Sequence, residues 1–349
     1  MWLAKRPLGW VCALLFAVAP LLGEEPSDCS LPTLLVGVAD DHGAVPANLT
    51  SVNFRVTHRG RPTGSLRAVY TEGPRRVIVL LDMSGSMRGP EAKRYPKWEI
   101  ARAAARSLIA SLPSSSAAEL MTFTKSVEIQ APLSVDHRLA EAWLDNDAAR
   151  QVASVKGPTA MYAAIEAAEK QLQPTQPGDA IYVVTDGGEN ASRVSGSKVE
   201  KSLLSSGVRL FAFLVISSGL KTIQEIDGTS ELRVVVADSG GFMQTAWPKT
   251  VGPEQASTPG VSAYAWTSQL PSGSGLAFDD FTREQIQLHT NLLSHWISAF
   301  YLLSFQMPEG MSKPKHLDVT VIDSQGHARK DLTLAYSHAA PCAIAPTSH

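Results

Sequence analysis

Residues 77–86 read Val-Ile-Val-Leu-Leu-Asp-Met-Ser-Gly-Ser, and this segment is the most informative part of the sequence. Five apolar residues in succession are typical of a strand that is buried on both faces of a sheet. Three oxygen-bearing side chains follow at every second position, namely Asp82, Ser84 and Ser86. Oxygen donors on one tight turn suit a small divalent cation, because Mg²⁺ favours oxygen ligands in octahedral geometry. We therefore expect a metal site where this strand ends.

Strand-like and helix-like segments alternate from residue 76 onward. Strand patterns occur at residues 77–81, 119–123, 127–130, 180–185 and 208–216, and helical patterns at 98–112, 138–148, 160–172 and 198–205. This alternation predicts an α/β fold, with a doubly wound, mostly parallel sheet and helices on both faces. Such sheets bind ligands at the carboxyl ends of their strands.

Two further loops place oxygen donors at equivalent positions. Thr159 lies in Lys-Gly-Pro-Thr-Ala, immediately before a predicted helix, and Asp186 lies in Val-Val-Thr-Asp-Gly-Gly, immediately after a predicted strand. Together with the first turn, three separate loops would bring five oxygen donors to one edge of the sheet. Water or a carboxylate of a partner would complete an octahedron around the cation.

Short alternating strand patterns lie at both ends of the chain. They occur at residues 33–40, 53–57 and 65–70, and again at 300–306, 316–322 and 332–336. We expect these six strands to form a small β-sandwich-like region built from both chain ends. The predicted division of the chain is a signal peptide at 1–23, an N-terminal β-region at 30–74, an α/β core at 75–245, a Pro/Ser/Gly-rich loop at 246–280, a helix at 281–298 and C-terminal strands at 299–338.

The N-terminus has the pattern of a secretory signal peptide. Lys5 and Arg6 precede an apolar stretch at residues 10–22, which ends before Gly23 and a polar segment. The apolar stretch is short for a membrane-spanning helix, and no later segment is long and apolar enough to span a bilayer. We therefore expect a secreted, periplasmic or cell-envelope protein, with no transmembrane segment in the mature chain.

The charge and cysteine content limit the partners and the covalent chemistry. The 349 residues carry a formal net charge of −2, which gives no argument for nucleic acid as a partner. Removal of the signal peptide would leave Cys29 and Cys342 near opposite ends of the chain. An exported compartment permits a disulfide between them if the chain ends meet, and two separate thiols are the alternative.

The three loops, taken in order, resemble the metal-ion-dependent adhesion site of von Willebrand factor type A domains. The matching motifs are Asp-Met-Ser-Gly-Ser, Gly-Pro-Thr and Thr-Asp-Gly, within about residues 75–245. The resemblance implies a Rossmann-like sheet and a site for Mg²⁺, or for Mn²⁺ or Ca²⁺. It implies that the metal-site residues are Asp82, Ser84, Ser86, Thr159 and Asp186. The hydroxyls would ligate directly, and the aspartates frequently through water. Pro158 is a departure, because a glycine often stands there.

The flanking strands resemble those of secreted acidobacterial von Willebrand A-related proteins. These resemblances imply a divalent-metal-dependent protein-binding or adhesion module that engages an acidic side chain of a protein partner. The alternative is a structural or envelope-assembly component in which the metal only stabilises the fold. We expect no enzyme activity, because Ser84-Gly85-Ser86 does not match the nucleophile pattern Gly-x-Ser-x-Gly. Nor do His289 and His295, six residues apart on a predicted helix, share a face as zinc ligands would.

Overall fold

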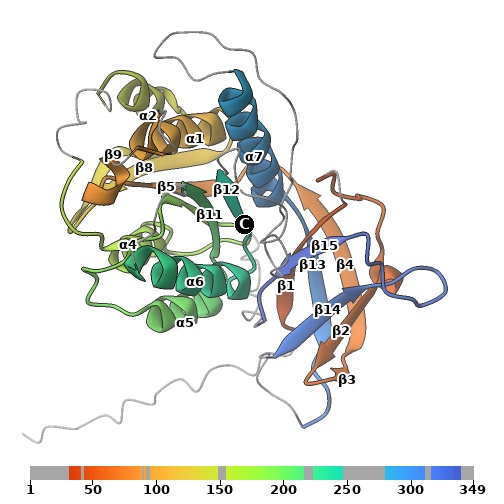
Figure 1. Ribbon diagram of the computed structural model, residues 1–349. Coiled ribbons are helices and arrows are strands. Elements are labelled where there is room, and N and C mark those ends of the chain that lie inside the picture. The colour runs from red at the N-terminus through yellow and green to blue at the C-terminus, as the bar shows by residue number, and fades with distance from the viewer. Residues whose placement is uncertain are drawn as a thin grey trace, which may run out of the picture.

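A six-stranded sheet forms the centre of the computed structural model, which describes residues 31–40, 43–88, 90–91, 95–147, 155–215, 223–246, 280–310 and 316–338 (Figure 1). The strand order is β12-β11-β10-β5-β8-β9. The strands are β5 (Arg76–Asp82), β8 (Ala117–Phe123), β9 (Val127–Ser134), β10 (Ala180–Thr185), β11 (Arg209–Val215) and β12 (Met243–Ala246). All neighbours are parallel except β8 and β9. The carboxyl ends of β5 and β10 therefore lie next to each other.

The central strand β5 is buried on both faces, as its unbroken apolar run predicts. Val77, Val79 and Leu81 belong to the apolar core on one side of the sheet, whereas Ile78 and Leu80 belong to the core on the other side. Successive side chains of a strand point to opposite faces, so a strand covered by helices on both sides needs apolar residues at every position.

Helices cover both faces of this sheet (Figure 1). On one face lie α1 (Lys97–Ser111), α7 (Asp280–Ser298) and α2 (Arg138–Ala142), which continues into the π-helical turn η3 (Trp143–Asp147). On the other face lie α4 (Met161–Gln171), α5 (Gly196–Ser206) and α6 (Ile223–Asp238). The inner face of α1 is rich in alanine, with Ala101, Ala104 and Ala105 all fully buried, so the helix approaches the sheet closely.

Two small antiparallel sheets flank the α/β core, and both combine strands from the two ends of the chain. One sheet has the order β15-β1-β13-β4 and the other β14-β2-β3. Their strands are β1 (Thr33–Ala39), β2 (Phe54–His58), β3 (Arg61–Pro62), β4 (Gly64–Glu72), β13 (Ala299–Gln306), β14 (Leu317–Val321) and β15 (Thr333–Tyr336). Apolar side chains of both sheets share one core. The predicted fold class, with a β-region built from both chain ends, is therefore confirmed.

The flanking sheets join the α/β core at the end of α7. Gly37 of β1 leaves room for Trp296, because a Cβ at this glycine would lie 2.5 Å from the indole ring. The indole stacks on Phe242 with a centroid distance of 4.9 Å. Arg209 at the start of β11 donates to the carbonyl oxygens of Trp296 and Ile297 at 3.0 and 2.8 Å. These are last-turn carbonyls of α7, which have no partner within the helix.

Several local predictions differ from the structure. The helix predicted at 138–148 is α2 followed by a π-helical turn, and α6 was not anticipated. The remaining short elements are the 3₁₀ turns η1 (Ser51–Asn53) and η2 (Gly85–Arg88) and the strands β6 (Pro90–Glu91) and β7 (Tyr95–Pro96).

Other predictions concern residues that the structure does not describe. The signal peptide, Cys29, Cys342 and nearly all of the 246–280 loop lie outside the described residues. Within the described ranges, no helix combines the length and the hydrophobicity that a bilayer span requires.

Candidate functional site

The first site loop begins at Asp82, the last residue of β5. Asp82 is buried, and its Oδ1 accepts the Ser84 backbone N–H at 2.8 Å while its Oδ2 accepts the Thr185 hydroxyl at 2.6 Å. The carboxylate thus shapes its own turn and ties β5 to the end of β10. The Oγ atoms of Ser84 and Ser86 are 3.1 Å apart. Ser84 is buried whereas Ser86 is exposed, so the turn presents one hydroxyl to the surface.

The second loop, which ends in Thr159, is attached to the first through backbone atoms. Gly85 donates its N–H to the carbonyl oxygen of Gly157 at 3.0 Å. A Cβ at Gly85 would lie 3.4 Å from that oxygen, so the two loops pack closely at this glycine. Gly157 has a φ of +92°, a conformation that favours glycine.

The third loop joins Thr159 to Asp186. The Thr159 N–H donates to Oδ1 of Asn190 at 2.8 Å, and the Thr159 carbonyl accepts the N–H groups of Asn190 and Ala191 at 3.0 Å each. A Cβ at Gly188 would lie 3.4 Å from Asp186 Oδ1 and 3.7 Å from Thr159 Oγ1, so both oxygens face this glycine. The structure therefore brings the three predicted loops together at one edge of the sheet.

Helix α6 packs directly against the third loop. A Cβ at Gly228 would lie 2.1 Å from the carbonyl oxygen of Gly187, so α6 and the loop touch through their backbones. Gly187 has a φ of +87°, and a Cβ there would lie 2.3 Å from the Thr229 hydroxyl. Only glycines permit this approach, which holds the loop that carries Asp186 in place.

Glu189 is a site residue that the sequence did not reveal. Its carboxylate accepts the backbone N–H of Tyr162 at 3.0 Å, in the first turn of α4, and those of Ala191 and Ser192 at 3.0 and 2.8 Å. The first N–H groups of a helix lack partners within the helix and attract negative charge. Glu189 therefore caps α4 from the neighbouring loop and fixes the position of that helix beside Thr159.

Lys97 is the second residue that the sequence did not reveal. It is the first residue of α1, and its Nζ lies 2.7 Å from Oδ2 of Asp186. The two side chains are only 4% and 1% exposed, so they form a buried ion pair. A lysine in the first turn of a helix opposes the helix dipole. Such a position, just before the buried Trp98, was a signal for a carboxylate partner.

The electrostatics and the donor chemistry fit a small divalent cation. Burial, together with the neighbouring Asp186 carboxylate, raises the pKa of Asp82 to about 7. Two buried carboxyl groups therefore disfavour each other's ionisation beside the loops in which Ser84, Ser86 and Thr159 contribute hydroxyl oxygens, so a cation would be favoured there. Oxygens are the ligands that Mg²⁺ and Ca²⁺ prefer. Among the described residues, no three or more His, Cys, Asp or Glu side chains are arranged so that they could hold a metal ion together, and the proposed set contains only two carboxylates.

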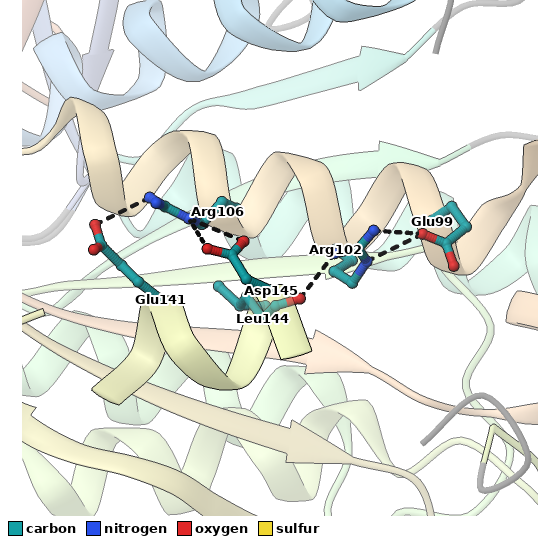
Figure 2. Close-up of polar contacts among 6 residues, drawn as sticks. All are labelled: Glu99, Arg102, Arg106, Glu141, Leu144 and Asp145. Carbon is teal, nitrogen blue, oxygen red and sulfur yellow. Dashed lines mark hydrogen bonds and ion pairs between the residues drawn. The ribbon is translucent and has the colours of Figure 1, made fainter. Parts of the chain in front are cut away.

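Polar contacts also join helix α1 to α2 and η3 (Figure 2). Arg102 donates to the Leu144 carbonyl at 2.8 Å and to the Glu99 carboxylate at 2.8 and 3.0 Å. Arg106 pairs with Glu141 at 3.0 Å. These side chains are a quarter to a third exposed, so we expect each pair to contribute at most about 1 kcal/mol. Glu99 lies on α1 itself, whereas the contacts with Leu144 and Glu141 join α1 to η3 and α2 and so orient the helix that carries Lys97.

Some known proteins and one family model are similar to most or part of this chain. A structure of the conserved hypothetical protein BatB from Bacteroides thetaiotaomicron is 19% identical, with 50% of this chain and 90% of that chain covered and a TM-score of 0.40. A von Willebrand factor type A structure from Catenulispora acidiphila is 12% identical, with 90% and 75% covered and a TM-score of 0.41. No curated protein matches the chain. Residues 77–189, which include all three site loops, match the family model of the von Willebrand factor type A domain.

Proposed function

We propose that the chain is a protein-binding module whose contact point is the edge formed by the ends of β5 and β10. The observation that carries this proposal is that the three loops which carry the five oxygen donors contact one another at that edge. The residues that would hold a divalent cation, most simply Mg²⁺, are Asp82, Ser84, Ser86, Thr159 and Asp186. When bound, the cation supplies a positive charge with an open position for an acidic side chain of a partner. The match to a family whose domains often mediate protein interactions supports this role.

Neighbouring groups of the chain orient two of the five proposed ligands. Thr185 and the Ser84 N–H orient Asp82, and Asn190 orients Thr159 through the hydrogen bonds described above. The exposed Ser86 marks the side from which a partner would approach. We further propose a secreted, periplasmic or cell-envelope location, which rests on the signal-peptide pattern at residues 1–23. A binding role rather than catalysis is part of the same proposal.

Metal binding is the first test. We would titrate Mg²⁺ and Mn²⁺ into the wild type, Asp82→Ala and Ser86→Ala by calorimetry, with Ser205→Ala as the control because Ser205 is an exposed serine on α5. Both site variants should bind more weakly, and the control should match the wild type. Ser86 is exposed, so its substitution should leave the fold intact. Equal binding by the wild type and both site variants would refute the metal site.

Partner recognition is the second test. Arrays of peptides that contain Asp or Glu, with matched Asn and Gln arrays, would be probed in Mg²⁺ and in EDTA. We expect binding that requires both the acid and the metal, and the same chelator sensitivity for a partner recovered from the native extracellular fraction. Partner binding that survives both EDTA and Asp82→Ala would instead favour the alternative function, a structural or envelope-assembly component whose metal only stabilises the fold.

A further inference from the structure

The Lys97–Asp186 ion pair lies within the proposed site rather than beside it. Lys97 begins α1, and Asp186 follows β10, so the pair links a helix N-terminus to the carboxyl edge of the sheet. The Nζ to Oδ2 distance is 2.7 Å, and both side chains are almost fully buried. An ammonium group therefore already occupies one oxygen of a residue that we assign to the metal.

Helix stability does not explain this lysine. A positive charge in the first turn opposes the helix dipole, and burial of an ammonium group is unfavourable unless a counter-charge accompanies it. The neighbouring carboxylates do explain it. Asp82 and Asp186 are 0% and 3% exposed, and they repel each other across the ends of adjacent strands. Lys97 offsets one of these negative charges and keeps both carboxylates in position.

The two oxygens of Asp186 have different neighbours. Oδ2 binds the Lys97 ammonium, whereas Oδ1 accepts the Gly188 N–H at 3.3 Å and faces the same glycine as the Thr159 hydroxyl. A cation held by the five donors would share a carboxylate with the ammonium, and the two positive charges would lie within a few ångströms of each other. Like charges at such distances repel strongly in a buried site.

We propose that Lys97 is a tethered counter-cation that competes with the divalent ion for Asp186. The ion and the ammonium would repel each other at this shared carboxylate, so the lysine lowers the affinity for the metal. In the absence of the ion, the same ammonium preserves the arrangement of the two carboxylates. This inference rests on the proposed function, because it assumes that the five donors bind a divalent cation.

The test compares the metal affinity of the wild type with Lys97→Met, which keeps the length of the side chain, and Lys97→Gln, which keeps an N–H donor for Asp186. Lys170→Met is the matched control, because it removes an exposed lysine near the end of α4. Mn²⁺ binding is followed by its EPR signal and Mg²⁺ binding by calorimetry. Both Lys97 variants should bind about tenfold more tightly or better, since repulsion between nearby like charges exceeds the energy of a tenfold change.

The change in unfolding temperature on addition of Mg²⁺, measured for each variant against its own metal-free form, separates metal affinity from any loss of stability. Mg²⁺ should raise the unfolding temperature of Lys97→Met and Lys97→Gln more than that of the wild type, because tighter binding stabilises the folded state more. Tighter binding by the variants supports the inference, including the case in which the wild type binds no detectable metal.

Two results would overturn the inference, and they differ in what they say about the proposed function. In the first case, the wild type binds the metal, Asp82→Ala does not, and the Lys97 variants bind no more tightly than the wild type. The proposed competition is then wrong, and the metal site stands. If neither the wild type nor any Lys97 variant binds Mg²⁺ or Mn²⁺, both the competition and the metal-dependent function are wrong.

Discussion

Replacement of Lys97 by methionine should destabilise the metal-free protein by about 3–5 kcal/mol, the typical cost of removing one partner from a buried ion pair. Unit charges 2.7 Å apart attract by about 6 kcal/mol at an effective dielectric constant of about 20. Removing each ion from water costs several kcal/mol, so the intact pair contributes little net stability. The variant would nevertheless keep the cost of burying Asp186 and lose the attraction that offsets it.

The assay is urea unfolding in EDTA, followed by circular dichroism, for the wild type, Lys97→Met, Asp186→Asn and the double variant. Each single substitution should be strongly destabilising, because it removes one charge of the buried Lys97–Asp186 pair and keeps the other buried. The double variant should lose less than the sum of the two, which is the signature of direct coupling. Lys170→Met should lie within about 0.5 kcal/mol of the wild type. A loss below about 1 kcal/mol for Lys97→Met, or strict additivity in the double variant, would refute the buried pair.

Three further substitutions test other parts of the structure. Asn190→Ala removes the acceptor of the Thr159 N–H and should lower Mg²⁺ affinity by calorimetry about tenfold, as is usual for groups that orient ligands; unchanged affinity would contradict the role of Asn190. Gly241→Ala places a Cβ 1.7 Å from the Leu210 carbonyl oxygen and should lower the free energy of unfolding in urea by about 3 kcal/mol or more. Wild-type stability of this variant would show that the backbone at Gly241 and at Leu210 is not this close. Burial lowers the pKa of His289 from 6.5 to about 4. The free energy of unfolding should therefore be highest above pH 6.5 and should fall by at most about 3 kcal/mol as the pH falls toward 4, because the unfolded chain takes up the proton first. His289→Leu should flatten the pH dependence of stability in that window, and parallel curves for the two proteins would count against the assignment.

The fold class and the meeting of the three loops could be predicted because both depend on local patterns. An unbroken apolar run such as 77–81 indicates a strand buried on both faces, and its alternation with helices implies parallel neighbours. Parallel strands place their carboxyl ends at one edge of the sheet. When two such strands are adjacent, the polar residues at their ends, such as Asp82 and Asp186, must lie close together. The structure places these strands, β5 and β10, side by side.

Helix α6 could not be predicted from the same patterns. Its sequence contains Gly228 and a run of three valines at residues 234–236, both of which disfavour helix in isolation. Tertiary packing overrides these preferences. The glycine admits the Gly187 carbonyl, and Val235 and Val236 fill the core beneath the sheet. A residue that weakens a helix locally is here the one that lets the helix reach the site.

The negative charges of the site could be predicted from local sequence, whereas the positive charge that offsets them could not. The positions of Asp82 and Asp186 are set by where two strands end, which the sequence shows. Their neutralisation depends on where α1 begins relative to β10, which only the tertiary structure shows. Yet two carboxylates buried at one edge require positive charge nearby, because an isolated buried charge is unfavourable. A search for that charge would have led to Lys97, a lysine placed against the helix dipole and directly before the buried Trp98.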